Sequence, residues 1–312
     1  MKESVIFGID VGGTTIKCGL FDTEGKLLEM WEIPTRTEEN GAGILPDVAE
    51  TVREQIRKRG LEMQQILGLG IGVPGPVSAA GEVARAVNLH WERKDVAGEL
   101  GEALGLKVRV ANDANVAALG EMWMGGGKGT SSLILLTLGT GVGGGVIVDG
   151  KIVTGAHGAG GEVGHAAVEP NETERCNCGN RGCLEQMASA TGLVRLAEKY
   201  LAASEEESSL RGAKISAKAV FDAYKEGDRA AEAIVDQFAS YLGRTMAIFA
   251  CVTDPEIFVL GGGVSKAGEP LVRAVENYYR QYAFSSCKDT PIVLAKLGNE
   301  AGIYGAARMV MD

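Results

Sequence analysis

The sequence lacks an excess of basic residues. Its 312 residues include 31 Lys and Arg against 41 Asp and Glu, which gives a formal net charge of −10 at pH 7. This balance argues against a long basic surface for nucleic acid. Anion sites built from backbone N–H groups stay possible, because they need no net positive charge.

Two common nucleotide-binding patterns are also missing. No Gly-x-x-x-x-Gly-Lys-Ser/Thr occurs, and no Gly-x-Gly-x-x-Gly opens a helix near the N-terminus, so neither a P-loop nor a Rossmann site is supported. Glycine itself is abundant, at 45 residues, about twice its usual share of roughly 7%. Because there is no Gly-x-y period, we expect tight turns or close backbone approaches to ligands rather than collagen.

The chain shows no secretory signal and no membrane segment. Met1-Lys2-Glu3 is charged, and the apolar stretch Val5 to Asp10 follows directly. Gly129 to Val148 has no formal charge and is long enough to span a bilayer, but its clustered glycines favour two buried strands and a turn. We therefore expect a soluble, cytoplasmic protein with no membrane partner.

The periodicity of apolar residues predicts an α/β protein of about two domains. Strands are expected at 5–10, 16–22, 26–33, 66–73, 108–111, 133–138, 142–148, 256–260 and 291–295. Helices are expected at 48–59, 95–104, 114–123, 189–202, 216–225, 229–250, 270–282 and 301–311. Residues 150–190 form a long irregular stretch, which is usually functional or organised by something extra.

Three glycine-rich turns follow or link predicted strands. They are Asp10-Val11-Gly12-Gly13-Thr14-Thr15, Leu138-Gly139-Thr140-Gly141-Val142-Gly143 and Gly261-Gly262-Gly263. The first two are similar and suggest two related domains that face one ligand. Glycine lets the backbone approach a phosphate and threonine adds donors, while Asp10 would hold Mg²⁺ directly or through water. The alternative for each is an ordinary tight turn, with Asp10 capping its own loop.

A possible metal site lies in the irregular stretch. His165, Cys176, Cys178 and Cys183 offer one imidazole and three thiolates, a closed tetrahedral set for a structural zinc ion. The alternative is four unrelated residues in a loop. Cys18, Cys251 and Cys287 are isolated and are most simply small core residues.

Polar residues near this cluster and after one strand suit a ligand rich in hydroxyl groups. Glu162 and Glu185 flank the metal set and would be held by it. Asn112-Asp113 follows a buried strand and opens a helix, so Asp113 is either a helix cap or a general base for an attacking hydroxyl.

Taken together, these residues resemble the ROK family (repressor, open reading frame, kinase) of actin-like sugar kinases. The similarity covers the whole chain and rests on six segments: Asp10 to Thr14, Pro74-Gly75-Pro76, Asn112-Asp113, Leu138 to Gly144, Glu162 to His165 and Cys176 to Glu185. Val73-Pro74-Gly75-Pro76-Val77 and Asn88-Leu89-His90-Trp91 are similar to the ROK glucokinases of bacteria. Thr15, where many members have lysine, and His90, where glycine is common, depart from the pattern.

The resemblance implies a two-lobed actin-like (ribonuclease H-like) ATPase fold with a ligand cleft between the lobes. The expected lobes are 1–115 plus 300–312, and a larger lobe, 116–299, with a zinc loop at 155–187. The implied activity is ATP-dependent phosphorylation of glucose at its 6-hydroxyl, with Asp113 as the base, and with ATP, Mg²⁺ and zinc as cofactors.

The resemblance also assigns residues to each ligand. The sugar would be bound by Gly75, Asn88, Asn112, Asp113, Glu162, His165 and Glu185. The nucleotide and its metal would be bound by Asp10, Gly12, Gly13, Thr14, Thr15, Gly139, Thr140, Gly141, Gly261, Gly262 and Gly263. His165 would bind zinc through one ring nitrogen and a sugar hydroxyl through the other.

Two other readings belong to the same family. A kinase for another hexose, such as N-acetylmannosamine, fructose or allose, is the first. A sugar-sensing repressor is the second, but the first strand starts too near the beginning of this sequence to leave room for a helix-turn-helix before it. The sugar and ATP are the expected partners, and related kinases imply a homodimer or homotetramer.

Overall fold

The computed structural model describes residues 4–78 and 80–311, so the charged start Met1-Lys2-Glu3 lies outside the described residues. The chain forms two compact units. The first comprises Met1–Ser131, Gly145–Gly161 and Lys296–Asp312, and the second comprises Ser132–Gly144 and Glu162–Ala295. No helix among the described residues has the length and apolar character needed to cross a membrane.

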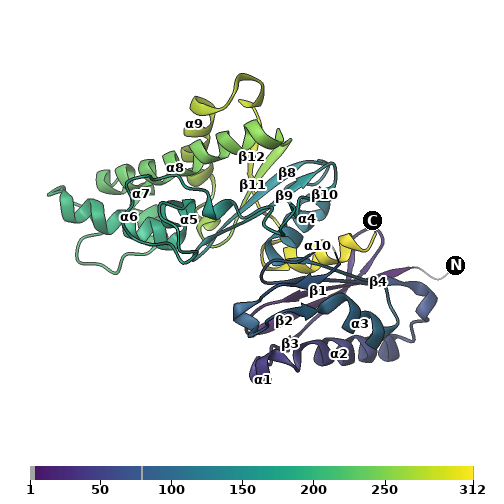
Figure 1. Cartoon of the computed structure of the whole chain (residues 1–312). Helices are drawn as coiled ribbons and strands as arrows, with labels where there is room; N and C mark the ends of the chain where they lie inside the picture. Colours follow the sequence, from purple (N-terminus) through teal and green to yellow (C-terminus); the bar gives the residue numbers. More distant parts are fainter. Residues whose placement is uncertain (1–3, 79, 312) are drawn as a thin grey trace. The chain divides into compact units, whose positions relative to one another are not determined.

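The first unit is built on a five-stranded sheet with the order β3-β2-β1-β4-β7 (Figure 1). Its strands are β1 (Val5–Val11), β2 (Thr15–Asp22), β3 (Leu27–Pro34), β4 (Ile66–Val73) and β7 (Val108–Asn112). Its longer helices are α2 (Ile44–Arg59), α3 (Val96–Leu104), α4 (Asp113–Met124) and α10 (Ala301–Met309), and it also contains α1 (Glu38–Gly41), β5 (Glu82–Val83) and β6 (Lys94–Asp95). β1, β4 and β7 are parallel, so their carboxyl ends meet at one edge.

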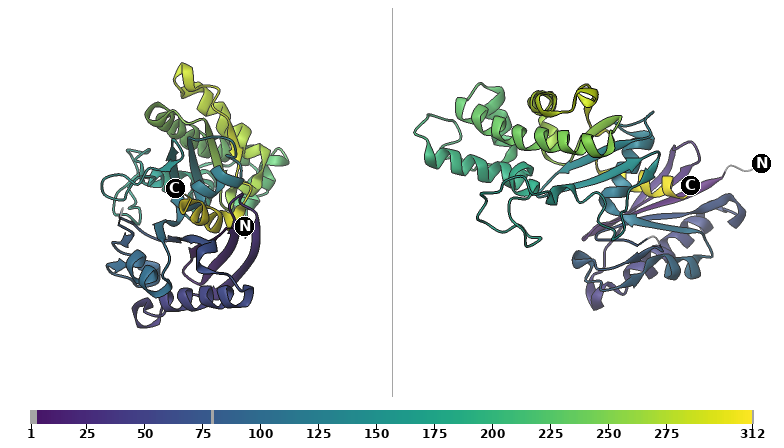
Figure 2. Two further views of the ribbon diagram at one scale, coloured as in Figure 1. Left: turned by 90° about the vertical axis from the view of Figure 1, so that its right-hand side faces the viewer. Right: turned by 45° about the horizontal axis from the view of Figure 1, so that its top comes forward.

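Alternation along β1 assigns its side chains to two cores. Phe7 and Ile9 belong to the buried cluster that includes Val48 of α2, whereas Ile6 packs with Ile303 of α10 on the opposite face. In Figure 1, α2 runs along one face of this sheet and the yellow helix α10 lies on the other, and the turned views of Figure 2 agree. The face toward α10 also holds Asp10.

Several glycines serve close packing between helices and sheet. A Cβ atom on Gly70 of β4 would lie 1.7 Å from the carbonyl oxygen of Ala306, and one on Gly305 would lie 1.6 Å from that of Val116. Both distances are far below van der Waals contact, so α10 rests directly on β4 and on α4. Part of the glycine excess therefore reflects helix packing, a use that we did not expect from the sequence.

The second unit contains a sheet with the order β10-β9-β8-β11-β12. Its strands are β8 (Leu133–Leu138), β9 (Val142–Val148), β10 (Lys151–Ile152), β11 (Ile257–Gly261) and β12 (Ile292–Leu294). The second half of β9, from Gly145, and the whole of β10 are assigned to the first unit. The helices are α5 (Leu184–Ala188), α6 (Ala190–Ala203), α7 (Ala217–Lys225), α8 (Arg229–Thr253) and α9 (Glu269–Tyr282). β8, β11 and β12 are parallel, with β11 between the other two.

The expected strands and helices are present, with ends that differ by a few residues. The helix expected over 48–59 begins at Ile44, and the one expected over 229–250 runs to Thr253. The division into units differs from the expected lobes of 1–115 plus 300–312 and 116–299. Because Gly120 and Gly305 let α4 and α10 meet backbone to backbone, α4 belongs to the first unit, which is the larger one. Residues 155–161 of the expected zinc loop also belong there.

Candidate active site

The first glycine turn joins β1 to β2 and exposes its backbone. Gly12 N–H donates to the Thr15 carbonyl oxygen at 3.1 Å, and Thr35 Oγ1 donates to the Gly12 carbonyl oxygen at 2.7 Å. Gly12, Gly13 and Thr14 are exposed. Asn88 lies beside this turn, because a Cβ on Gly13 would lie 3.7 Å from the Asn88 Cβ. The turn is thus rigid at its base and open at its tip, as a phosphate site requires.

Asp10 sits at the end of β1 in a setting that disfavours its charge. Its pKa is raised from 3.8 to about 6, mainly because the carboxyl is buried and also because Asp113 lies nearby, while Lys17 acts in the opposite direction. Both acids border Gly72, whose added Cβ would lie 3.7 Å from Asp10 Oδ1 and 3.7 Å from Asp113 Cα. Two neighbouring acids of this kind suit a hard cation such as Mg²⁺, because its charge would offset their repulsion.

The junction between β7 and α4 positions Asn112 and Asp113. The Asn112 side chain caps the helix, since its Oδ1 accepts from Ala114 N–H at 3.0 Å and from Asn115 N–H at 3.3 Å. Its Nδ2 donates to the Gly75 carbonyl oxygen at 3.2 Å, which joins two of the residues predicted to bind sugar. Asn112 therefore occupies the N-cap position, and Asp113 begins the first turn, where its Oδ1 also accepts from Ala114 N–H at 2.8 Å.

The ends of three parallel strands bring these groups together. Asp10 is paired with Gly72, and Val73 with Asn112, in the registers of β1, β4 and β7. Parallel strands present their carboxyl ends at the same edge, which is where ligands bind in open α/β sheets. Asp10, Gly75, Asn112 and Asp113 are thus gathered at one edge of the first unit.

In the second unit, the four expected metal ligands converge. The His165, Cys176, Cys178 and Cys183 ligand atoms all lie within 4.8 Å of one another. Cys176 Sγ is 3.8 Å from His165 Nδ1, and Cys178 Sγ is 3.6 Å from Cys183 Sγ. Zinc–sulfur bonds of about 2.3 Å in a tetrahedron place two sulfurs about 3.8 Å apart, so the residues fit a zinc ion.

The cluster fixes two of the predicted sugar ligands. His165 points Nδ1 at the cysteines, and its Nε2 is 3.9 Å from Glu162 Oε2. Glu185, in the first turn of α5, accepts from Cys176 Sγ at 3.5 Å through Oε1 and from Val142 N–H at 3.2 Å through Oε2. A Cβ on Gly141 would lie 1.8 Å from Glu185 Oε2, so this glycine makes room for the carboxylate.

The two glycine turns of the second unit are neighbours. Gly262 has φ of +81°, and a Cβ there would lie 2.6 Å from the backbone of Leu138, so glycine is required. Gly139 N–H donates to the Gly141 carbonyl oxygen at 2.9 Å, and Ala190 N–H donates to that of Gly139 at 2.8 Å. The turn at 138–143 is therefore anchored to the start of α6, beside the turn at 261–263.

A cavity of about 340 Å³ opens beside Gly263, and sequence reasoning missed it. Its lining includes Lys218, Phe221 and Lys225 from α7 and Lys266 after β11. The helical spacing of the α7 residues indicated only a packed helix, and nothing in the sequence linked that helix to the glycine turn. The cavity combines an aromatic ring, three lysines and the third glycine turn.

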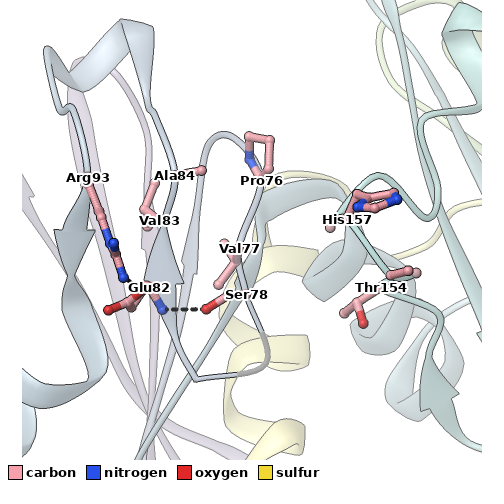
Figure 3. A pocket seen from close by; sticks show the side chains of 12 residues that line it. Pro76, Val77, Ser78, Glu82, Val83, Ala84, Arg93, Thr154 and His157 are labelled. Carbon is pink, nitrogen blue, oxygen red and sulfur yellow. Dashed lines mark hydrogen bonds and ion pairs between the residues drawn. The ribbon is translucent and has the colours of Figure 1, made fainter.

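A second unforeseen cavity, of about 500 Å³, lies in the first unit next to Gly75. Figure 3 shows Ser78, Glu82 and Arg93 on one side of it and Thr154 and His157 on the other. Arg93 Nη2 lies 2.6 Å from Glu82 Oε2, and Ser78 Oγ accepts from Glu82 N–H at 3.2 Å, so these groups are already paired. In the sequence, the one indication of this cavity is that part of its lining directly follows the Pro74-Gly75 turn.

The paired α/β units have the actin-like two-domain fold of sugar kinases, and comparison with known proteins agrees. The ROK family model matches residues 6–312, and this chain belongs to the ROK family. A glucokinase from Halalkalibacterium halodurans is 40% identical over 317 residues, which cover 99% of this chain and 96% of that protein.

Two solved structures extend the similarity. The ROK hexokinase from Thermus thermophilus has a TM-score of 0.81 and 34% identity, covering 97% of this chain and 96% of its own. A ROK family glucokinase from Streptomyces griseus, in complex with glucose and AMPPNP, has a TM-score of 0.73 and 32% identity, covering 98% and 99%.

Proposed function

We propose that this chain is a glucokinase that phosphorylates glucose at its 6-hydroxyl with ATP. The observation that supports this most directly is the β7–α4 junction, where Asn112 caps the helix and Asp113 stands in its first turn beside Asp10. The similarity to glucokinases over nearly the full chain supports glucose as the substrate.

In the proposed reaction, the Asp113 carboxylate accepts the proton of the 6-hydroxyl. The oxygen forms a bond to the γ-phosphorus while the bond from that phosphorus to the bridging oxygen breaks, which releases ADP. General base catalysis contributes typically about 10²–10⁴-fold to such a step. Mg²⁺ held near Asp10 would neutralise charge on the phosphates, which is the main requirement of phosphoryl transfer.

The remaining predicted residues are proposed to bind the two substrates. Asn112, Gly75 and Asn88 of the first unit, and Glu162, His165 and Glu185 of the second, bind the sugar. Gly12, Gly13, Thr14 and Thr15, together with Gly139, Thr140 and Gly141, approach the phosphates through their backbones. Gly261 and Gly262 lie in the same turn as Gly263, which borders the cavity at Phe221, where an adenine ring would find an aromatic side chain.

Zinc is proposed to be structural. Four protein ligands close a tetrahedral site and leave no open position for hydrolysis. The ion would hold His165 with its Nε2 turned outward, and it would hold Cys183 directly before α5, in whose first turn Glu185 lies. The thiols that this site needs are kept reduced in the cytoplasm, which supports that location.

We also propose a homodimer or homotetramer. The second unit exposes a group of apolar side chains around the end of α8: Ile248 is 61% exposed, Val252 78% and Phe284 63%. Arg244 lies over the Tyr282 ring, 5.0 Å from its centroid, at the same place. Aromatic, aliphatic and arginine side chains of this kind are enriched at subunit interfaces.

A coupled assay of ADP release over a panel of sugars tests the substrate. Glucose should give the highest kcat/KM, above N-acetylmannosamine, fructose and allose. A higher value for one of the other sugars would reassign the chain to the alternative, a ROK kinase for that hexose.

A further inference from the structure

Glu121 is a buried carboxylate with an unusual set of partners. It lies in α4 and is 1% exposed. Its Oε1 accepts from Leu297 N–H at 2.8 Å, and its Oε2 accepts from Lys296 N–H at 3.0 Å and from Gly126 N–H at 2.7 Å. A buried carboxylate is costly unless it is hydrogen-bonded, and backbone N–H groups satisfy this one on both oxygens.

The donors come from two places where the chain passes between the units. The chain returns from the second unit to the first at Gly145 and again at Lys296, and Lys296 is the first residue after the last return. Gly126 opens the segment that leaves the first unit after Ser131. The backbone of Glu121 adds to this, because its carbonyl oxygen accepts from Gly125 N–H at 3.1 Å and from Gly127 N–H at 2.9 Å.

The glycine after α4 is fitted to this carboxylate. A Cβ on Gly125 would lie 2.0 Å from Glu121 Oε2. Any other residue at this position would push the carboxylate off its donors or move the connecting segment. The Glu121 carboxylate and Gly125, both at the C-terminal end of α4, therefore act together to hold the connecting segment.

The same helix holds the candidate base at its other end. Asp113 and Glu121 are eight residues apart, or about 12 Å along the axis of α4. Between them, Gly120 rests on α10, because a Cβ there would lie 2.2 Å from the Ala301 carbonyl oxygen. Because α4 is packed tightly on α10, a shift of α4 at Glu121 is expected to shift Asp113 at the other end of the helix.

We propose that Glu121 is a positioning residue, which fastens the first and the last of the four chain connections between the units to the helix that presents Asp113. When the second unit moves during the catalytic cycle, the connections turn on α4 while the base keeps its place. Hinges of this kind are a few residues at the ends of elements, far from the chemistry. The inference rests on the proposed kinase function.

Glu121→Gln tests it, because glutamine keeps the shape but replaces one acceptor oxygen with an NH₂ donor that faces N–H groups. We expect kcat to fall about tenfold to a hundredfold, as small misplacements of reacting groups do. The glucose Kd should stay within about twofold, because no residue proposed to bind the sugar is altered. Gly125→Ala, which displaces the carboxylate without changing it, should have the same effect and decides the matter if Glu121→Gln does not fold.

Thr51→Val is the matched control. Thr51 is 8% exposed in α2 of the same unit and accepts from Trp31 Nε1 at 2.9 Å, remote from the chain connections. It should lower Tm and leave kcat unchanged at a temperature where all variants are folded. A folded Glu121→Gln with lower Tm but wild-type kcat would overturn the inference, because the role would then be structural alone. An inactive wild-type protein would instead refute the proposed function, and the inference with it.

Discussion

At the scale of single residues, the proposed reaction depends on what Asn112 and Asp113 each do. An Asp at the start of a helix is usually a cap, and the sequence alone could not separate that role from catalysis. The structure gives the cap to Asn112, whose Oδ1 accepts two backbone N–H groups. Asp113 Oδ1 also accepts from Ala114 N–H, at 2.8 Å, and Asp113 lies at the same edge of the sheet as Asp10.

Replacing Asp113 with Asn should separate binding from chemistry. The amide keeps the shape and can hydrogen-bond the 6-hydroxyl, but it cannot accept its proton. We expect kcat to fall by about 10²-fold or more while glucose still binds, because the lost contribution is that of a general base. Steady-state kinetics together with a titration of glucose binding measure both. Near-native kcat would remove Asp113 from the catalytic role.

Asp10 predicts a conflict between stability and function. Its pKa is about 6 in the folded protein against 3.8 ordinarily, so the folded state disfavours the charged form. Below about pH 4 the Asp10 carboxyl is protonated in the folded and the unfolded protein, so it does not lower the free energy of unfolding. As the pH rises through 6 the folded protein must ionise this buried group, and above pH 6 the free energy of unfolding is lower by roughly 3 kcal/mol.

Asp10→Asn should therefore be more stable than the wild type by roughly 1–3 kcal/mol at pH 8 and nearly equal to it at pH 4. Activity with Mg²⁺ and ATP should fall in the same variant, because the cation loses a ligand. Urea unfolding at the two pH values, without Mg²⁺, provides the comparison. If the variant and the wild type had the same free energy of unfolding at both pH values, ionisation of Asp10 would not destabilise the folded protein.

At the scale of elements, the metal cluster organises a loop that has little regular structure. The segment from His165 to Cys183 contains few backbone hydrogen bonds of helix or sheet type, so four ligands and one ion would replace them. α5 begins directly after Cys183, and Glu185 lies in its first turn. The position of that carboxylate thus follows from the metal site.

Cys178→Ala should release this loop. We expect the purified wild type to contain about one zinc per chain, and the variant to lose it, with a raised KM for glucose because His165 and Glu185 lose their anchor. Elemental analysis and kinetics measure the two effects. Cys251→Ala is the control, since Cys251 is an exposed free thiol on α8 outside the cluster. A zinc-free wild type with full activity would contradict the assignment.

The sequence predicted these elements better than it predicted their grouping. Apolar periodicity located the strands and helices, because burial of one face leaves a repeating pattern. It could not show that α4 rests on α10, since that contact depends on Gly120 and Gly305 meeting backbones far away in the chain. The cavity at Phe221 and the partners of Glu121 were missed for the same reason: distant segments form them.

At the scale of the whole molecule, the two units hold different parts of the proposed chemistry. The first contains Asp10 and Asp113, and the second contains the metal cluster and two of the three glycine turns. Motifs with fixed spacing, such as the cysteine cluster, could be predicted because their members are close in sequence. The proposed reaction draws on residues of both units, and its defining feature is the transfer of phosphate from ATP to the 6-hydroxyl of glucose.

The most direct test is to identify the product. Purified protein is incubated with glucose, ATP and Mg²⁺, and the phosphorylated sugar is examined by two-dimensional phosphorus–proton NMR. We expect a single sugar phosphate whose phosphorus is coupled to the two protons on carbon 6, with one ADP formed for each sugar phosphate. A phosphate on another carbon, or ATP hydrolysis without any sugar phosphate, would contradict it.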